Sequence, residues 1–430
     1  MFKKCIITAI TVALMFSAAA AQTGGRIETH TFYSQTLEVT KNYIVYLPEG
    51  YDSSTARYPS VYFLRLHENE WFNNSLPGRN GSSLKHVLDT LITNGVIGKM
   101  IIVGPSTGSN NGLVSGAVNM LSPNLTTATG IGTGKFEDYL IHDLITHIDA
   151  TYRTIPDPAH RGVDGFSLGG YSSTVISFRN PGIFRSVGSY DGTIMWYNLD
   201  DPGISGTDPD DPIWMSAQYN GIIGPLFGIP RDVGYMLQHS AINVLVEASP
   251  SRLDSIRAMK FHIHAGASTA VTNLLRNIQL LDSMAAKGIY NSFENVVLAP
   301  NAIHDYGFAD LHASLSLVKH WEVLQPPASI EERPVHLPLA GELHQNYPNP
   351  FNPSTVIGYR LEKAGDVQLS IYNLLGQHVI NLVAARQPAG RYRVEWNGKD
   401  AHGRPVPSGI YFYRLTAGEL SQTRRMLLLR

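Results

Sequence analysis

Ser167 lies at the centre of a short motif whose residue types suit a nucleophile. Residues 165–169 fit the pattern G-x-S-x-G, in which the glycines permit a tight turn from a strand into a helix. Such a turn projects the serine hydroxyl into solvent, beside the helix N-terminal amides that favour a developing oxyanion. Gly and Ser are common in any loop, but here a strand pattern precedes the motif and a helical pattern follows it. The motif therefore predicts a serine nucleophile, with the Leu168 amide as one oxyanion donor.

His304 is the predicted base for this serine. A serine nucleophile needs a histidine later in the chain and an acid that orients the imidazole. His304 follows the apolar run that ends at residues 298–299, so it lies on the loop after the last predicted strand. Other histidines lie within a predicted strand or a helix-like stretch, where packing is the more frequent role: His262, His264, His312 and His320.

Strands that alternate with helical patterns predict an α/β sheet over residues 22–325. The predicted strands are 43–46, 60–64, 100–103, 162–165, 186–189, 260–264 and 293–299. Helical patterns cover 137–152, 171–179, 271–287 and 315–324. Residues 326–342 have no periodicity and are predicted to be a linker between independent cores. Short alternating strands with glycine turns then predict a small all-β sandwich, residues 343–430.

The order of these parts resembles the "putative esterase" family of α/β hydrolases. Segments 31–34, 45–52 and 58–64 are similar to the family's opening strands, and 165–170 is similar to its nucleophile turn. The family contains enterochelin esterase-like, feruloyl and acetylxylan esterase-like, and S-formylglutathione hydrolase-like proteins. The resemblance implies an α/β hydrolase fold, a mostly parallel sheet with helices on both faces. It also implies ester hydrolysis through an acyl-enzyme, with no cofactor.

The loop after the predicted strand 60–64 departs from the family's pattern. Family members place His-Gly there, and the glycine backbone shapes the oxyanion hole, whereas residues 65–71 contain no glycine. The hole is then expected from the Leu168 amide together with an amide near Leu66 or His67. The alternative is a loop that no longer serves catalysis, since a missing donor lowers the rate about a hundredfold or more.

The acid departs from the pattern as well. The family places an Asp after the strand 260–264, but residues 265–270 contain no carboxylate. By topology the nearest substitute is Asp191, at the end of the preceding strand, although an Asp-Gly pair after a strand is often only a turn. Asp305, next to the base, is a second candidate. We predict Asp191, and without any acid a Ser–His dyad would remain.

An insertion between Asp191 and Ile242 suits a lid or a substrate wall. Trp196 within it and Trp71 after the strand 60–64 are candidates to stack on sugar or aromatic rings of a substrate, with simple packing as the alternative. Aspartates gather in the insertion, but their spacing does not match the known twelve-residue calcium loop. We therefore expect a solvated loop and no metal.

The N-terminus has the three parts of a secretory signal. Residues 1–21 contain Lys3 and Lys4, an apolar run from Cys5 to Phe16, and small residues at 19–21. Cys5 is the one cysteine among 430 residues, so the mature protein is expected to hold no disulfide. The net charge is −2 and no basic stretch is long enough to hold a nucleic-acid backbone, so nucleic acid is not an expected partner.

Residues 343–430 are similar to the type A sorting domain of the type IX secretion pathway. The Asn/Pro-rich opening 343–353, four later strand or turn elements at 355–359, 371–376, 389–398 and 408–413, and a basic pair near the end carry this resemblance. It implies an address read by the outer-membrane translocon, and hence passage through the periplasm of a Gram-negative bacterium to its surface or the medium. The alternative is an Ig-like carbohydrate-binding module.

Together these observations predict a secreted or surface-displayed serine esterase. Export suggests an extracellular substrate, such as an acylated polysaccharide or a siderophore ester. The alternative is a non-catalytic binding protein with a hydrolase fold, because the usual acid and the usual glycine of the oxyanion loop are both missing.

Overall fold

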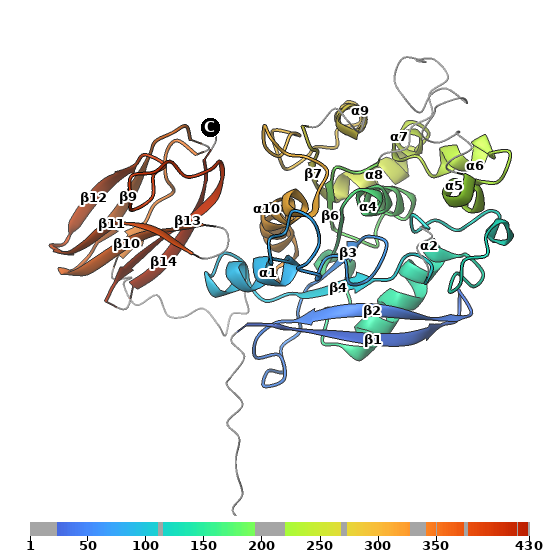
Figure 1. Cartoon of the computed structure of the whole chain (residues 1–430), viewed down its shortest axis with the longest axis horizontal. Helices are drawn as coiled ribbons and strands as arrows, with labels where there is room; N and C mark the ends of the chain where they lie inside the picture. Colours follow the sequence, from blue (N-terminus) through green and yellow to red (C-terminus); the bar gives the residue numbers. More distant parts are fainter. Residues whose placement is uncertain are drawn as a thin grey trace, which may run out of the picture.

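A seven-stranded, mostly parallel sheet forms the centre of the larger domain (Figure 1). The computed structural model describes residues 24–110, 115–193, 220–267, 273–326, 341–349, 351–373, 377–418 and 420–428. The strands run in the order β1-β2-β4-β3-β5-β6-β7, and only the pairs β1–β2 and β2–β4 are antiparallel. Their bounds are β1 Arg26–Ser34, β2 Val39–Leu47, β3 Ser60–Leu64, β4 Ile101–Pro105, β5 Arg161–Gly165, β6 Ser186–Tyr190 and β7 Lys260–His264. Every residue of β3, β4, β5 and β6 is buried, as expected for parallel strands that helices cover on both faces.

Helices cover both faces of this sheet. Alternate side chains of β3 belong to different buried clusters, because successive strand residues face opposite sides: Tyr62 and Leu64 to one, Val61 and Phe63 to the other. On the Phe63 side lie α1 Leu84–Thr93 and α10 Tyr306–Leu324. On the Tyr62 side lie α2 Phe136–Asp138, the π-helical turn η2 Tyr139–Leu144, α3 Ile145–Thr151, α4 Leu168–Arg179, α5 Asn220–Phe227, α6 Val233–Gln238, α7 Ala241–Val246, α8 Pro250–Ala258 and α9 Asn273–Ala286. Two 3₁₀ turns complete the domain, η1 Pro123–Leu125 and η3 Pro158–His160.

One predicted strand is wrong. Residues 293–299 run beside the end of β7 but form no strand. The bridges there are isolated ones, from Asn291 to Phe261 of β7 and from Val297 to Ala265, the residue after β7. The Asn291 side chain accepts from the Ile263 amide at 2.8 Å and donates to the Ile263 carbonyl at 2.8 Å. Because this amide side chain takes the place of backbone pairing, no regular ladder forms. The other predicted strands fall on β2 to β7, with small differences at their ends.

The C-terminal module is a sandwich of two antiparallel sheets. One sheet has the order β11-β10-β13-β14 and the other β12-β9-β8. The bounds are β8 Gly341–Leu343, β9 Thr355–Leu361, β10 Gly365–Asn373, β11 His378–Gln387, β12 Gly390–Trp396, β13 Gly409–Ala417 and β14 Leu420–Leu428. Trp396, Tyr411 and Tyr413 are buried in a core of its own, so these rings pack the sandwich and are not a platform for sugars. Its first strand begins at Gly341, inside the segment predicted as linker.

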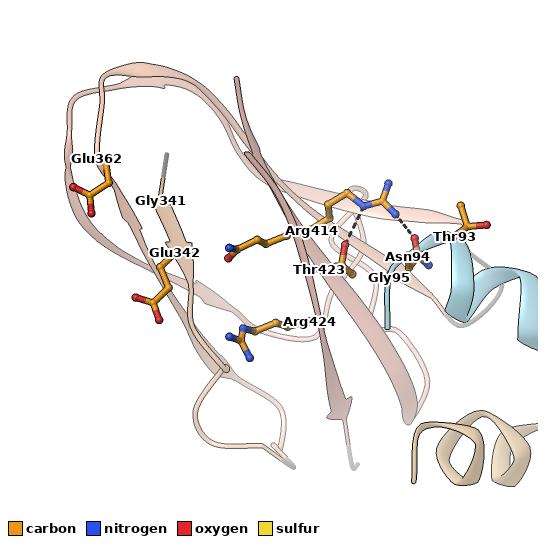
Figure 2. A pocket seen from close by; sticks show the side chains of 10 residues that line it. Thr93, Asn94, Gly95, Gly341, Glu342, Glu362, Arg414, Thr423 and Arg424 are labelled. Carbon is orange, nitrogen blue, oxygen red and sulfur yellow. Dashed lines mark hydrogen bonds between the residues drawn. The ribbon is translucent and has the colours of Figure 1, made fainter. Parts of the chain in front are cut away.

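The two modules have separate cores but touch each other. Phe412 of β13 is buried in the cluster that contains α1 and α10, and Tyr372 packs against the same cluster. Arg414 donates a hydrogen bond to Asn94, the C-cap of α1, and also to Thr423 at 3.2 Å (Figure 2). Beside this contact lies an open cleft of about 910 Å³, lined by Thr93, Asn94, Gly95, Gly341, Glu342, Glu362, Arg414, Gln422, Thr423 and Arg424.

Candidate active site

Ser167 forms the turn between β5 and α4 with φ 59° and ψ −118°. A non-glycine residue at positive φ is strained, and such strain persists only where the surrounding structure imposes it. At the positions of the motif's glycines there is no space for a Cβ atom. A Cβ on Gly165 would lie 2.2 Å from Gly169 backbone atoms, and a Cβ on Gly169 would lie 1.9 Å from the Leu64 carbonyl oxygen. The glycines therefore allow the end of β3 and the first turn of α4 to close around the serine.

The structure brings Ser167, His304 and Asp191 into one line of hydrogen bonds. His304 Nε2 lies 2.9 Å from Ser167 Oγ, and His304 Nδ1 is hydrogen-bonded to Asp191 Oδ2. The Asp191 and Ser167 residues are nearly buried, whereas the His304 side chain is 27% exposed. With Nδ1–H directed at the carboxylate, Nε2 is left as the acceptor for the serine hydroxyl proton.

Asp191 is held firmly at the end of β6. Its backbone has φ 46°, and its amide donates to the His264 carbonyl at 2.8 Å. Oδ1 accepts from the Gly266 amide at 3.2 Å, and the Asp191 carbonyl accepts from Asn273 Nδ2 at 3.1 Å. Gly266 follows β7, the position at which the resemblance implies an acid. The neighbouring strand end thus supplies the carboxylate, and the usual position supplies an amide that orients it.

The three predicted oxyanion donors have different surroundings. The Leu168 amide is at the first position of α4, where no partner within the helix is available. The Leu66 amide has no acceptor among the described residues, and a Cβ on Gly169 would lie 3.1 Å from Arg65 N, which places this loop against the nucleophile turn. The prediction for His67 is wrong, because its backbone amide already donates a hydrogen bond to Glu70 Oε1 at 2.8 Å. Leu168 and Leu66 are therefore the remaining candidate pair.

Comparisons with known proteins agree with this architecture. Residues 34–218 match the family described as "Putative esterase", and residues 352–420 match the family described as FlgD Ig-like domain. A ferulic acid esterase structure is similar with a TM-score of 0.53 and 22% identity, over 70% of this chain and 98% of that chain. The larger domain therefore has the α/β hydrolase fold. An S-formylglutathione hydrolase from Agrobacterium tumefaciens gives a TM-score of 0.49 and 17% identity, over 70% of this chain and 96% of that one.

One curated relative shares part of the hydrolase domain's sequence. The endo-1,4-beta-xylanase/feruloyl esterase of Xylanibacter ruminicola is 30% identical over 185 residues, which are 41% of this chain and 23% of that protein. The chain thus spans about a quarter of the length of that relative.

Asp305, the second candidate for the acid, caps a helix instead of bonding the base. Asp305 is the N-cap of α10, and its Oδ1 accepts from the Phe308 amide at 2.9 Å. An acceptor at this position satisfies one of the free amides of the first helical turn. Asp305 therefore fixes the start of α10 directly after His304, while Asp191 bonds the imidazole.

The two predicted substrate-stacking tryptophans are not confirmed. The prediction that Trp71 stacks on a substrate ring is wrong. Trp71 is only 1% exposed, packs edge-on against Phe63 and donates from Nε1 to the Leu64 carbonyl at 3.0 Å. It belongs to the core and is not available to a substrate ring. Trp196 lies outside the described residues. The aromatic ring beside the base is instead Phe166, whose centroid is 4.7 Å from that of His304.

A fully buried carboxylate lies beneath the nucleophile turn. Asp164 of β5 bonds His312 Nε2 at 3.2 Å and His320 Nε2 at 3.1 Å, both on α10. It also accepts from Ser316 Oγ at 2.6 Å and from the Gly165 amide at 2.7 Å. These contacts tie the strand that leads into Ser167 to the helix that follows His304. The histidines set aside as packing residues are thus members of a polar network.

Burial and neighbouring charged groups shift the pKa values of several side chains in this network. Although burial opposes ionisation, the His312 and His320 imidazoles hold the pKa of Asp164 well below its usual range. Burial lowers the pKa of His262 and His264 well below the usual value, so these two rings are neutral. His262 bonds Ser186 Oγ at 2.8 Å, and His264 Nδ1 lies 3.1 Å from His312 Nδ1. The sequence carried one signal for this network, an Asp within an otherwise apolar strand.

Across the described residues, no group of His, Cys, Asp and Glu side chains is arranged to hold a metal ion. Within the same part of the chain, no helix has both the length and the apolar character required to cross a membrane.

Proposed function

We propose that this chain is a serine carboxylic-ester hydrolase that acts through an acyl-enzyme. The observation that carries the proposal is the unbroken line Ser167–His304–Asp191 at a strained strand-to-helix turn. In the first half-reaction His304 Nε2 takes the proton of Ser167 Oγ as this oxygen attacks the ester carbonyl carbon. The Leu168 and Leu66 amides stabilise the oxyanion, and the protonated His304 then gives its proton to the departing alcohol.

Water completes the cycle in the second half-reaction. His304 takes a proton from the water molecule as it attacks the acyl carbon, and returns that proton to Ser167 Oγ as the carboxylic acid leaves. The Asp191 carboxylate stabilises the imidazolium in both halves. Each of these roles belongs to a residue of this chain.

For the substrate we propose an ester of a plant-type phenolic acid with a polysaccharide. The support is the name of the curated relative, a xylanase joined to a feruloyl esterase, together with the ferulic acid esterase fold likeness.

The test is hydrolysis by the purified full chain. We expect turnover of 4-nitrophenyl acetate and methyl ferulate, and labelling of Ser167 by a fluorophosphonate, identified by peptide mass. Heat-denatured protein is the control for non-specific labelling. A folded chain that neither turns over these esters nor accepts the label would favour the non-catalytic binding protein.

We further propose that residues 1–21 direct export and that 343–430 are the sorting address, which places the protein on the cell surface or in the medium. The support is the signal-like N-terminus and the resemblance of the tail, whose residues 352–420 match an Ig-like family. In a host with the type IX pathway, a chain without 343–430 should stay in the periplasm. As a complement, residues 326–430 fused to an exported reporter should carry it to the surface. Surface display of the truncated chain would contradict the address.

A further inference from the structure

The loop after β3 is fixed without the glycine that the esterase pattern provides. Residues 65–71 include Glu70, whose carboxylate has three contacts. Oε1 accepts from the His67 amide at 2.8 Å, while Oε2 accepts from Tyr306 Oη and lies 3.1 Å from Arg65 Nε. One side chain thus bonds two parts of the loop and the first residue of α10.

Little solvent reaches these contacts. The Arg65 and Glu70 side chains are 13% and 12% exposed, so their ion pair is screened less than a surface pair. Tyr306 Oη also accepts from Arg65 Nε at 3.1 Å. Because Arg65 and Glu70 neutralise each other, we attribute to the pair a geometric role and not the recognition of a charged substrate.

A second layer fixes the loop from behind. Arg79 is buried, donates to the Glu70 and Asn73 carbonyls, and pairs with Asp310 of α10 through two bonds of 2.9 Å. Its guanidinium carbon lies 4.9 Å from the Tyr306 ring centroid. Bidentate Arg–carboxylate pairs of this kind are geometrically specific. The loop therefore cannot shift relative to α10 without breaking buried charged contacts.

The same contacts reach the catalytic residues. Tyr306 is two positions after His304, and its ring is 5.3 Å from the ring of Phe166, the neighbour of Ser167. The Arg65 guanidinium carbon lies 4.9 Å from that Phe166 ring. Glu70 and Tyr306 thus join the loop that bears the Leu66 amide to the segment that bears the base.

We propose that Glu70 and Tyr306 are positioning residues that hold the Leu66 amide in the oxyanion hole, in place of the usual glycine loop. This inference rests on the proposed esterase function. The pair acts on the transition state only, because an oxyanion donor matters when charge develops on the carbonyl oxygen. Its loss should lower kcat and leave KM nearly unchanged.

The test compares Tyr306→Phe with Tyr46→Phe. Both replacements remove a tyrosine hydroxyl that donates to a carboxylate in the hydrolase domain. The Tyr46 hydroxyl, however, donates to Asp89 of α1 at 2.8 Å and not to a residue of the loop 65–71. We expect Tyr306→Phe to lower kcat on 4-nitrophenyl acetate by about tenfold to a hundredfold, the effect of a small misplacement. The rate of fluorophosphonate labelling should fall in parallel, while Tyr46→Phe keeps both values.

Glu70→Gln should also lower kcat. The double variant Glu70→Gln/Tyr306→Phe should have a kcat only slightly below that of the slower single variant. The pH midpoint of kcat/KM should not move, because the His304–Asp191 pair is intact. Equal activities of Tyr306→Phe and Tyr46→Phe, or a loss confined to KM, would overturn the positioning role. An inactive wild-type chain would instead refute the proposed function.

Discussion

Replacement of Ser167 or His304 by Ala should lower kcat of ester hydrolysis by about a millionfold, the scale on which a nucleophile or base acts within a catalytic unit. The two are joined by the 2.9 Å contact between Nε2 and Oγ, so neither can work without the other. A chain lacking both should therefore be no slower than either single variant. Activity would be followed with 4-nitrophenyl acetate, and circular dichroism would verify the fold.

Asp191→Asn should lower kcat by about ten-thousandfold with KM nearly unchanged, because an amide there selects the wrong imidazole tautomer. Asp305→Asn is the matched control. Asn caps a helix as well as Asp does, so this variant keeps the start of α10 and should retain near-wild-type turnover. If Asp305→Asn were the more damaging of the two, the acid would be misassigned.

Asp164→Ala should destabilise the hydrolase domain by about 3–5 kcal/mol, the usual result of removing one partner from a buried charged pair. The change leaves His312 and His320 without their acceptor and the Gly165 amide unsatisfied. Asp254→Ala is the control, because its partner Arg257 forms a surface pair and such pairs contribute about 0–1 kcal/mol. Urea unfolding followed by tryptophan fluorescence measures both. Equal free energies of unfolding for the two variants would contradict a structural role for Asp164.

The same network makes stability depend on pH with a defined sign. The folded-state pKa values of His262 and His264 lie below the usual 6.5, so the unfolded chain binds more protons as the pH falls through that value. The lowered pKa of Asp164 acts with the same sign near and below its usual 3.8. The free energy of unfolding should therefore decrease from pH 8 to pH 5 and decrease further below pH 4. Asp164→Ala should make the second decrease smaller but not abolish it, because the pKa of Glu137 is also lowered, to about 2, by hydrogen bonds and by the nearby Arg179 charge that outweigh the effect of burial. A flat profile in the wild-type chain would contradict both assignments.

Much of the sheet could be predicted because its strands are continuous apolar runs between glycine- or proline-bearing turns. The segment 293–299 shows where this reasoning fails. It has the apolar composition of a strand, but Asn291 pairs with β7 through its side chain, and composition carries no signal for that substitution. The prediction that Trp71 stacks on a substrate ring failed for a similar reason. Proximity to the site along the chain does not reveal that a ring turns into the core.

The acid could be predicted only from topology. Asp191 has no distinguishing neighbours, since an Asp-Gly pair resembles any turn, but β6 pairs directly with β7 along residues 186–190. Their ends therefore lie side by side, and a carboxylate on one can replace a carboxylate on the other. For the role of Glu70, no comparable argument from strand order was available. Its partner Tyr306 is 236 residues away, and no local pattern predicts that contact.

Those long separations also affect how the chain becomes competent after synthesis. The Ser167–His304 contact spans 137 residues and the Arg79–Asp310 contact spans 231. Contacts of high sequence separation form only after loop closure has been overcome, so topologies rich in them fold slowly. A chain emerging from the ribosome would contain the nucleophile long before the base. Esterase activity would therefore appear only once α10 has docked, and its onset would measure the completion of folding.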